Sequence, residues 1–195
     1  MRAPAGGLQS TPRAPCVIVA GVIPAAGEVL HFSHDPTIVR FEPHVAATAQ
    51  QPEPYVWAVD APRCPDYWFP RDCPRAMAWV LPGTTARDRA EILGPGAERV
   101  HVIEHRWLEA LRTARLFAYR LPAEAFRPFG EPIPHALVAT SPVAPLGPPV
   151  PVGPLLDLHA GAGIELRVVA SLRPFAARAA GSSVGYRGIR LANAR

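Results

Sequence analysis

One short stretch holds the residues most suited to chemistry. It runs from Tyr67 to Arg75 and reads Tyr-Trp-Phe-Pro-Arg-Asp-Cys-Pro-Arg. The Tyr67 ring could stack on a base or a nicotinamide ring, because such rings offer a π face. The fork of donors on Arg71 matches a phosphate or a carboxylate. The structural alternative is that the aromatic rings fill the core beneath a rigid loop, while Arg71 and Asp72 form an ion pair.

Cys73 is a second candidate in this stretch. Arg71 and Arg75 are close in sequence, and positive neighbours favour the nucleophilic thiolate. The sequence identifies no Cys-His pair, which favours an inert buried thiol. The cysteines, Cys16, Cys64 and Cys73, are odd in number and lack C-x-x-C spacing. They predict neither a disulfide framework nor a zinc ribbon, and they favour a reducing compartment.

Polar residues also alternate on two predicted strands. His31 and Ser33 lie on the same face of the first strand, where a histidine could bind a ribose or a phosphate. The alternative is a histidine that is satisfied inside the fold. Glu165 and Arg167 alternate in the same way further along the chain. Their pairing with each other or with a neighbouring strand is the ordinary explanation, and a carboxylate facing a cleft is the alternative.

One motif suggests a metal. His101, Glu104 and His105 match the H-x-x-E-H pattern of one group of zinc peptidases, in which both histidines lie on one face of a helix. Residues 99–104 instead favour a strand. On a strand the two histidines would lie more than ~10 Å apart, at a rise of ~3.3 Å per residue. We therefore predict no metal site from this motif.

The elements that must position these residues are short. Strands are predicted at residues 28–33, 55–60, 76–81, 99–104, 116–121, 135–140, 164–169 and 188–191. Helices are predicted at residues 84–93, with a threonine N-cap, and at 107–113, 155–159 and 175–180. Residues 61–74 predict an irregular segment or a broken short helix. Strands outnumber helices without strict alternation, so the predicted fold is a single α+β domain with a mostly antiparallel or mixed sheet.

Composition limits the class of protein. Hydrophobic residues make up 49% of the 195 residues, which excludes a disordered chain, and the 25 prolines favour many short elements. All 20 basic residues are scattered arginines, which gives no strong nucleic-acid signal. The apolar stretch 16–24 is too short to span a bilayer. We predict a cytoplasmic protein with a disordered leader at residues 1–26 and one domain at residues 27–195.

The sequence resembles a family of uncharacterised bacterial proteins. The matching motifs include His-Phe-Ser-His-Asp-Pro at residues 31–36, Val-Trp-Ala-Val-Asp at residues 56–60 and the stretch from Tyr67 to Arg75. Shorter matches follow at residues 106–108, 119–122, 164–167 and 188–191. The resemblance covers the chain from about Leu30 to its C-terminus. It implies no known activity.

A more distant resemblance is to the ADP-ribosyltransferase fold. The order of a strand with His-x-Ser, an aromatic strand and a Tyr-bearing segment is similar to the beginning of that fold. The resemblance implies that His31 and Ser33 touch the ribose of NAD and that Tyr67 stacks on the nicotinamide. The late glutamate of the fold has no clear counterpart, because residues 140–143 contain no acid. Glu165 is a substitute only if the topology permits.

Our leading hypothesis is a domain with a nucleotide-binding cleft, of the NAD-dependent ADP-ribosyltransferase-like kind, with Glu165 as its catalytic carboxylate. In this hypothesis His31, Ser33, Tyr67 and Arg71 bind the ligand, and His31, Tyr67 and Arg71 line one concave site. The alternative is a non-catalytic module that uses the same cleft for a ligand or a protein partner. A zinc-dependent hydrolase is a third hypothesis.

Overall fold

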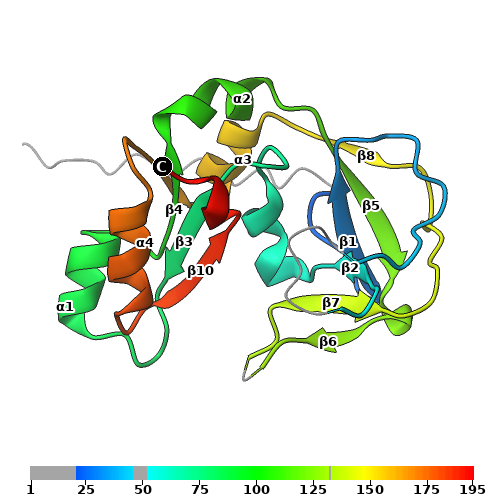
Figure 1. Ribbon diagram of the computed structural model, residues 1–195, viewed down its shortest axis with the longest axis horizontal. Helices are drawn as coiled ribbons and strands as arrows, with labels where there is room; N and C mark the ends of the chain where they lie inside the picture. Colours follow the sequence, from blue (N-terminus) through cyan, green and yellow to red (C-terminus); the bar gives the residue numbers. More distant parts are fainter. Residues whose placement is uncertain (1–20, 46–51, 132) are drawn as a thin grey trace, which may run out of the picture.

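The computed structural model describes residues 21–45, 52–131 and 133–195. Within these ranges the strands form three small sheets, and the helices are short (Figure 1). This arrangement confirms the predicted α+β class with antiparallel and mixed sheets. Each sheet combines strands from separate parts of the chain, so elements of different sheets alternate along the sequence.

The bounds of the elements are close to those predicted. The strands are β1 (Glu28–Ser33), β2 (Val56–Ala58), β3 (Arg75–Trp79), β4 (Arg99–Glu104), β5 (Leu116–Pro122), β6 (Arg127–Phe129), β7 (Ala136–Ala139), β8 (Val150–Val152), β9 (Glu165–Val169) and β10 (Gly185–Ile189). The helices are α1 (Ala86–Asp88), α2 (Leu108–Thr113), α3 (Leu155–Gly161) and α4 (Arg173–Ala180), with the shorter turns η1 (Ala61–Tyr67), η2 (Arg89–Leu93), η3 (His105–Trp107), η4 (Ala123–Ala125) and η5 (Leu191–Asn193).

The sequence did not predict β6 and β8, and the same physical reason explains both omissions. Each has a proline at its centre, Pro128 in β6 and Pro151 in β8. A proline cannot donate to a strand ladder, so it is tolerated at the edge of a sheet but not in its middle. Both strands are indeed edge strands, in the orders β2-β7-β6 and β1-β5-β8.

These two three-stranded sheets form the first lobe of the molecule, on the right in Figure 1. All of their strand pairs are antiparallel. An isolated bridge between Leu30 of β1 and Val59, just after β2, joins the two sheets. Its two backbone hydrogen bonds have N···O distances of 2.9 and 2.8 Å. The bridge holds β1 and β2 side by side at the place where the candidate pocket lies.

The second lobe is the four-stranded sheet β10-β3-β4-β9, on the left in Figure 1. Its β4–β9 pair is parallel and its other pairs are antiparallel. The helix α4 and the turn η2 cover one face and form a hydrophobic core with the small apolar residues of β3 and β4. The other face looks toward η1, which lies between the two lobes (Figure 1).

The predicted leader overlaps the folded part of the chain. Residues 1–20 lie outside the described residues, but Val22 is only 1% exposed and belongs to the same core cluster as Leu30 and Trp68. Ile23 packs against that cluster. The chain therefore contributes to the core from Val22 onward. Among the described helices, none has the length and apolar character needed to cross a membrane.

Candidate functional site

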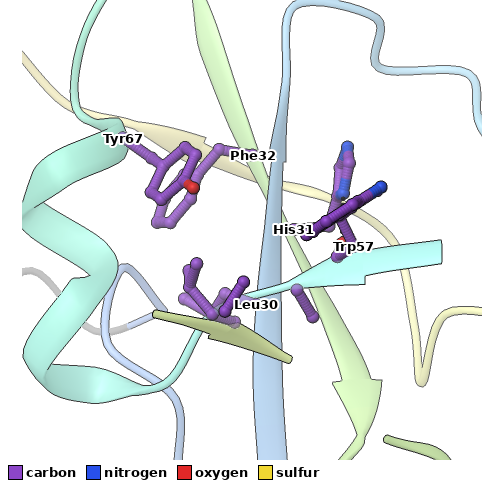
Figure 2. Close-up of a pocket in the computed structure, with 8 residues that line it drawn as sticks. Leu30, His31, Phe32, Trp57 and Tyr67 are labelled. Atoms are coloured by element: carbon purple, nitrogen blue, oxygen red, sulfur yellow. Dashed lines mark hydrogen bonds between the residues drawn. The ribbon is translucent and has the colours of Figure 1, made fainter. Parts of the chain in front are cut away.

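A small pocket lies in the first lobe between β1, β2, η1 and the start of β7 (Figure 2). Most of its lining is apolar or aromatic. The lining residues are Leu30, His31, Phe32, Trp57, Ala58, Val59, Tyr67 and Ala136. Pockets with apolar walls and few polar groups are the usual form of small-molecule sites, in which the walls bind rings and the polar groups fix orientation.

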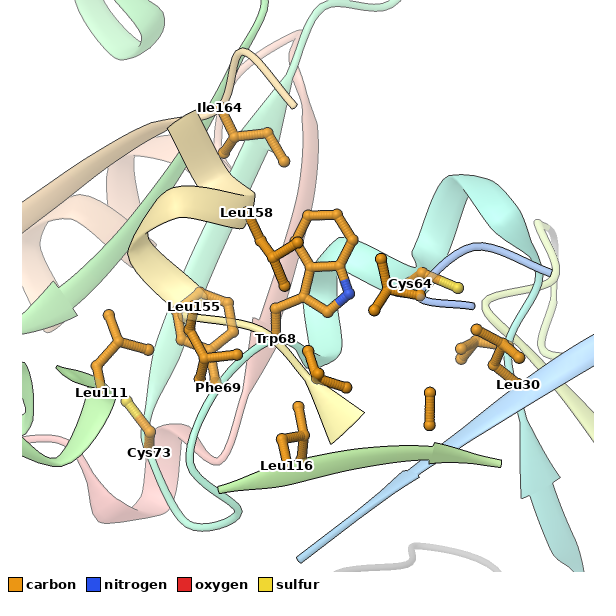
Figure 3. Close-up of a cluster of buried hydrophobic side chains, with 14 of the residues drawn as sticks. Leu30, Cys64, Trp68, Phe69, Cys73, Leu111, Leu116, Leu155, Leu158 and Ile164 are labelled. Atoms are coloured by element: carbon orange, nitrogen blue, oxygen red, sulfur yellow. The ribbon is translucent and has the colours of Figure 1, made fainter. Parts of the chain in front are cut away.

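The three consecutive aromatic residues after Asp66 separate into two roles. Trp68 and Phe69 are 3% and 2% exposed and lie in the core cluster. Trp68 lies beside Leu158 and Cys64 (Figure 3). Tyr67 ends η1, is half-buried and forms a wall of the pocket. The core-filling explanation therefore describes Trp68 and Phe69, and the ligand-facing explanation remains for Tyr67.

His31 is held in one orientation. Its Nδ1–H donates to the carbonyl oxygen of Trp57 at 2.7 Å, and its ring lies 4.6 Å from the ring of Phe41. Burial lowers the pKa of His31, and the charges of His44 and Arg71 lower it further against the opposing effect of the Trp57 bond. The imidazole is therefore neutral, and it points to the opposite side of β1 from Phe32 and Tyr67 (Figure 2).

Ser33 and Arg71, the other two predicted ligand residues, are not among the lining residues of the pocket. The Ser33 hydroxyl accepts a hydrogen bond from the main-chain N–H of Asp35 at 3.1 Å and so stabilises a turn. Arg71 is exposed, and its main-chain N–H donates to Nε2 of His34 at 3.0 Å. Both His31 and Tyr67 border the pocket, but the His31 imidazole lies on the far side of β1 from the Tyr67 ring, and Ser33 and Arg71 take no part.

Glu165, the predicted catalytic carboxylate, lies in the second lobe on β9. It is exposed, and its carboxylate pairs with Nε of Arg167 at 2.6 Å. The Arg167 guanidinium also donates to the carbonyl oxygen of Ile92 at 2.7 Å. The ordinary explanation, an ion pair along one strand, is the one that the geometry supports, and Glu165 is absent from the pocket lining.

Cys73 and the H-x-x-E-H motif also lack reactive geometry. Burial raises the pKa of the Cys73 thiol to about 12, against the opposing effect of Arg75, so the thiolate is not populated at neutral pH. His101 is buried on β4, whereas His105 is exposed at the start of η3. In the described ranges, no group of three or more His, Cys, Asp or Glu residues could hold a metal ion.

A cluster of charged side chains lies on the face of the second-lobe sheet that looks toward η1. We call it the arginine face, and define it by Arg75 of β3, Arg99 and His101 of β4, and Arg187 of β10. Strand register explains why these side chains lie close together. Met77 of β3 pairs with Arg187 of β10 and with His101 of β4, which places Arg187 and His101 in one row across the sheet. Cross-strand neighbours point to the same side of a sheet.

The buried carboxylate of Asp66, in η1, lies at the centre of the arginine face. It is 2% exposed and forms ion pairs with Nη2 of Arg99 and, at 3.3 Å, with Nη1 of Arg187. Arg75 is 3% exposed, and its Nε–H donates to the main-chain oxygen of Asp66 at 2.7 Å. Asp66 thereby fixes η1 against the sheet and connects the two lobes.

A directional chain of hydrogen bonds runs from Arg99 into the core. Nε–H of Arg99 donates to Nε2 of His101 at 2.9 Å, so that nitrogen carries no proton. Nδ1–H of His101 then donates to Nε2 of His159 at 3.1 Å, and Nδ1–H of His159 donates to the carbonyl oxygen of Leu155 at 2.7 Å. Each link fixes the tautomer of the next imidazole.

Burial keeps both imidazoles of this chain neutral. It lowers the pKa of His101 well below the usual range, and the neighbouring His159, Arg99 and Arg75 lower it further. It lowers the pKa of His159 to about 4, although the bond to Leu155 opposes the shift. Protonation of His101 at Nε2 would set two donors against each other, because Arg99 can only donate.

Arg187 connects the arginine face to the pocket. Its Nη2–H donates to the hydroxyl of Tyr67 at 2.9 Å, and its Nη1–H donates to the carbonyl oxygen of His135 at 2.9 Å. Tyr67 lines the pocket, and Ala136, the neighbour of His135, lines it as well. The pocket and the arginine face are therefore two adjoining parts of one candidate site.

Sequence reasoning missed most of the arginine face. It noticed His101 only in a metal motif and Arg75 only as a neighbour of Cys73. The alternation of Arg99 and His101 on a predicted strand was an available signal, since it is the same pattern that singled out His31. Arg187 gave no such signal, because the last strand was predicted to start at residue 188 and starts at Gly185.

Comparisons with known proteins bear on the whole domain. A family model described as "Family of unknown function (DUF6886)" matches residues 30–194, nearly the same range as the resemblance to uncharacterised proteins. No curated protein and no solved structure matches the chain.

Proposed function

The chain belongs to this family of unknown function, and on that premise we propose from its site alone that it is a small-molecule binding domain. Its pocket takes a flat ring such as a nucleotide base or a nicotinamide. One observation carries this proposal. The ring of Tyr67 forms a pocket wall, while its hydroxyl is held by Arg187 at 2.9 Å.

A fixed aromatic wall favours binding for a physical reason. A ligand that stacks on a mobile side chain must first order that side chain, which reduces the affinity. Tyr67 ends a rigid turn that contains Pro65, and its ring also lies 5.5 Å below the guanidinium carbon of Arg187. Much of the ordering is therefore present before a ligand arrives.

We propose binding rather than group transfer. Of the residues that the structure describes around the pocket, none is a carboxylate. Glu165 lies on β9 and pairs with Arg167. The distant resemblance to the ADP-ribosyltransferase fold makes NAD the first ligand to test. We also propose a cytoplasmic location, because the described cysteines, Cys64 and Cys73, are buried free thiols that need no oxidising compartment.

Calorimetry with NAD, ADP-ribose and adenosine tests the proposal. Stacking on Tyr67 should contribute ~1–3 kcal/mol, so Tyr67→Ala should weaken binding by a factor between about 5 and about 150. Tyr67→Phe is the matched variant, because it keeps the ring and removes only the hydroxyl. It should lose far less affinity for adenosine than Tyr67→Ala.

The same experiment separates binding from turnover. Glu165→Gln should leave the affinity for NAD unchanged, and incubation of the wild type with NAD should release no nicotinamide. Release that disappears in Glu165→Gln would instead support a transferase. The absence of heat with all three ligands at millimolar concentration would reject the binding proposal and favour a module for a protein partner.

A further inference from the structure

The arginine face carries more positive than negative charge. Arg75, Arg99 and Arg187 are three cations, and Asp66 is the one carboxylate that forms ion pairs with any of them in the described part of the chain. His101 and His159 are neutral and add no charge. The cluster therefore has a surplus of two positive charges close to the protein interior, where unpaired charges are costly.

Neutral groups stabilise this surplus without removing it. The guanidinium of Arg75 lies 5.0 Å from the centre of the Phe69 ring, and that of Arg99 lies 5.5 Å from the centre of the Trp79 ring. Nη1–H of Arg75 donates to the carbonyl oxygen of Cys73 at 3.0 Å, and Nη1–H of Arg99 donates to that of Pro62 at 3.1 Å. Rings and carbonyl groups attract cations, but they bring no countercharge.

Exposure shows where a countercharge could enter. The side chain of Asp66 is 3% exposed, whereas those of Arg99 and Arg187 are 21% and 17% exposed. Both arginines therefore reach solvent on one side and Asp66 on the other. Arg187 also touches Tyr67 and His135, which places that open side next to the pocket.

We infer that Arg187 and Arg99 form a subsite for the phosphate groups of the ligand whose ring lies against Tyr67. A ring next to one or two phosphates is the chemistry of a nucleotide, and guanidinium groups bind phosphate through charge-assisted hydrogen bonds. The inference rests on the proposed function, because one ligand is to span the pocket and the subsite. It explains why the fold keeps more arginines here than Asp66 can neutralise.

Three probes test the subsite on the wild-type protein: adenosine for the pocket alone, inorganic pyrophosphate for the subsite alone, and ADP-ribose for both. We expect pyrophosphate to bind and to raise the melting temperature. We expect ADP-ribose to bind at least about tenfold more tightly than adenosine. The affinity for ADP-ribose should fall with added KCl, and that for adenosine should not, because salt screens only the charged contact.

A pair of variants locates the charge. Arg187→Gln should weaken ADP-ribose binding at least about tenfold more than adenosine binding, because adenosine loses only the support that Arg187 gives to the Tyr67 hydroxyl, whereas ADP-ribose also loses its phosphate contact. Arg178→Gln is the matched control, because Arg178 is exposed on α4 and its loss changes the net charge equally. It should change neither affinity. Arg187→Lys keeps the charge and should retain part of the ADP-ribose affinity, so a folding defect in Arg187→Gln would not hide the result.

The outcomes distinguish the two proposals. Adenosine binding without pyrophosphate binding, or an equal fold-loss of affinity for adenosine and for ADP-ribose in Arg187→Gln, would overturn the subsite and keep the pocket. Pyrophosphate binding without adenosine binding would keep the anion site and overturn the proposed function. An equal effect of Arg178→Gln and Arg187→Gln on ADP-ribose would overturn the subsite in favour of a general charge effect.

Discussion

The two faces of the second-lobe sheet are built from the same strands and have opposite chemistry. On the face covered by α4, Ala76 and Ala78 alternate along β3, and Val100 and Val102 alternate along β4, all fully buried. On the arginine face the alternate positions are Arg75, Met77 and Trp79 of β3 and Arg99, His101 and Ile103 of β4, so guanidinium and imidazole groups lie there among apolar side chains. Alternation along a strand sends successive side chains to opposite faces, so a single sequence pattern produces both.

The two faces therefore contribute differently to the stability of the fold. The apolar face gains stability from every methyl group that it removes from water. The arginine face buries charge, which costs free energy unless each ion is paired, and apolar residues of similar volume would often serve stability as well or better. The phosphate subsite proposed above would account for this burial of charge.

The largest expected effect comes from removing the countercharge of the arginine face. Asp66→Asn leaves buried guanidinium groups uncompensated, and it should reduce the free energy of unfolding by about 3–5 kcal/mol in urea titrations. Asp157→Asn is the matched control, because Asp157 is exposed on α3. It should stay within about 0.5 kcal/mol of the wild type. Equal effects of the two variants would show that Asp66 is not the centre of the cluster.

The apolar face should respond to volume instead of charge. Leu172 is fully buried against β3 and β4, so Leu172→Ala should cost about 2–5 kcal/mol of unfolding free energy through the cavity that it leaves. That cost should be the same at low and high KCl, because no ion pair is lost. A salt-dependent cost would contradict the assignment of purely apolar packing to this face.

Acid should weaken the histidine chain that runs from the arginine face into the core. The pKa of His159 is about 4 in the folded chain and near 6.5 in the unfolded chain, so the unfolded chain binds more protons between these values. The stability from this group is complete above pH 6.5 and is lost as the pH falls toward 4. The loss should reach about 3 kcal/mol for His159.

Urea titrations across this pH range separate the contributions. His159→Gln keeps an acceptor for His101 and a donor for Leu155 but cannot titrate in this range, so its stability should fall less steeply in acid. Leu172→Ala should keep the full pH dependence of the wild type. A wild type and a His159→Gln variant with parallel pH curves would exclude the histidine chain as the acid-sensitive element.

The smallest effect is expected at the edge of the arginine face. A Cβ atom at Gly185 would lie 2.2 Å from Nε1 of Trp79, so Gly185→Ala must displace the indole that lies against Arg99. Overpacking of this kind costs about 1–3 kcal/mol. Gly188 lies on the same strand but faces the other side, where its Cβ would lie 2.4 Å from Cδ1 of Leu191 and 2.8 Å from the hydroxyl oxygen of Tyr186, both at the ends of side chains. Gly188→Ala should cost less, and the reverse order in thermal melts would contradict this comparison.

The sequence predicted the elements well and the site only in part. Aromatic and β-branched runs identified the strands, because those residues suit a pleated, half-buried surface. The wall residue Tyr67 was recognised from its type and its neighbours. The arginine face was not, because Arg75, Arg99 and Arg187 come from three strands and meet only through sheet register. Asp66, which joins them, looked like an ordinary loop residue between prolines.

The order in which the chain visits the two lobes has a consequence for how the molecule forms and breaks. The first lobe uses residues 28–59 and 116–152, and the second uses residues 75–104 and 165–189. Each lobe must therefore close a loop that contains part of the other before its sheet is complete, and such long-range closure slows folding. A cut in any one connection would leave no autonomous half. We expect limited proteolysis to yield nicked protein that stays whole until it unfolds in one step.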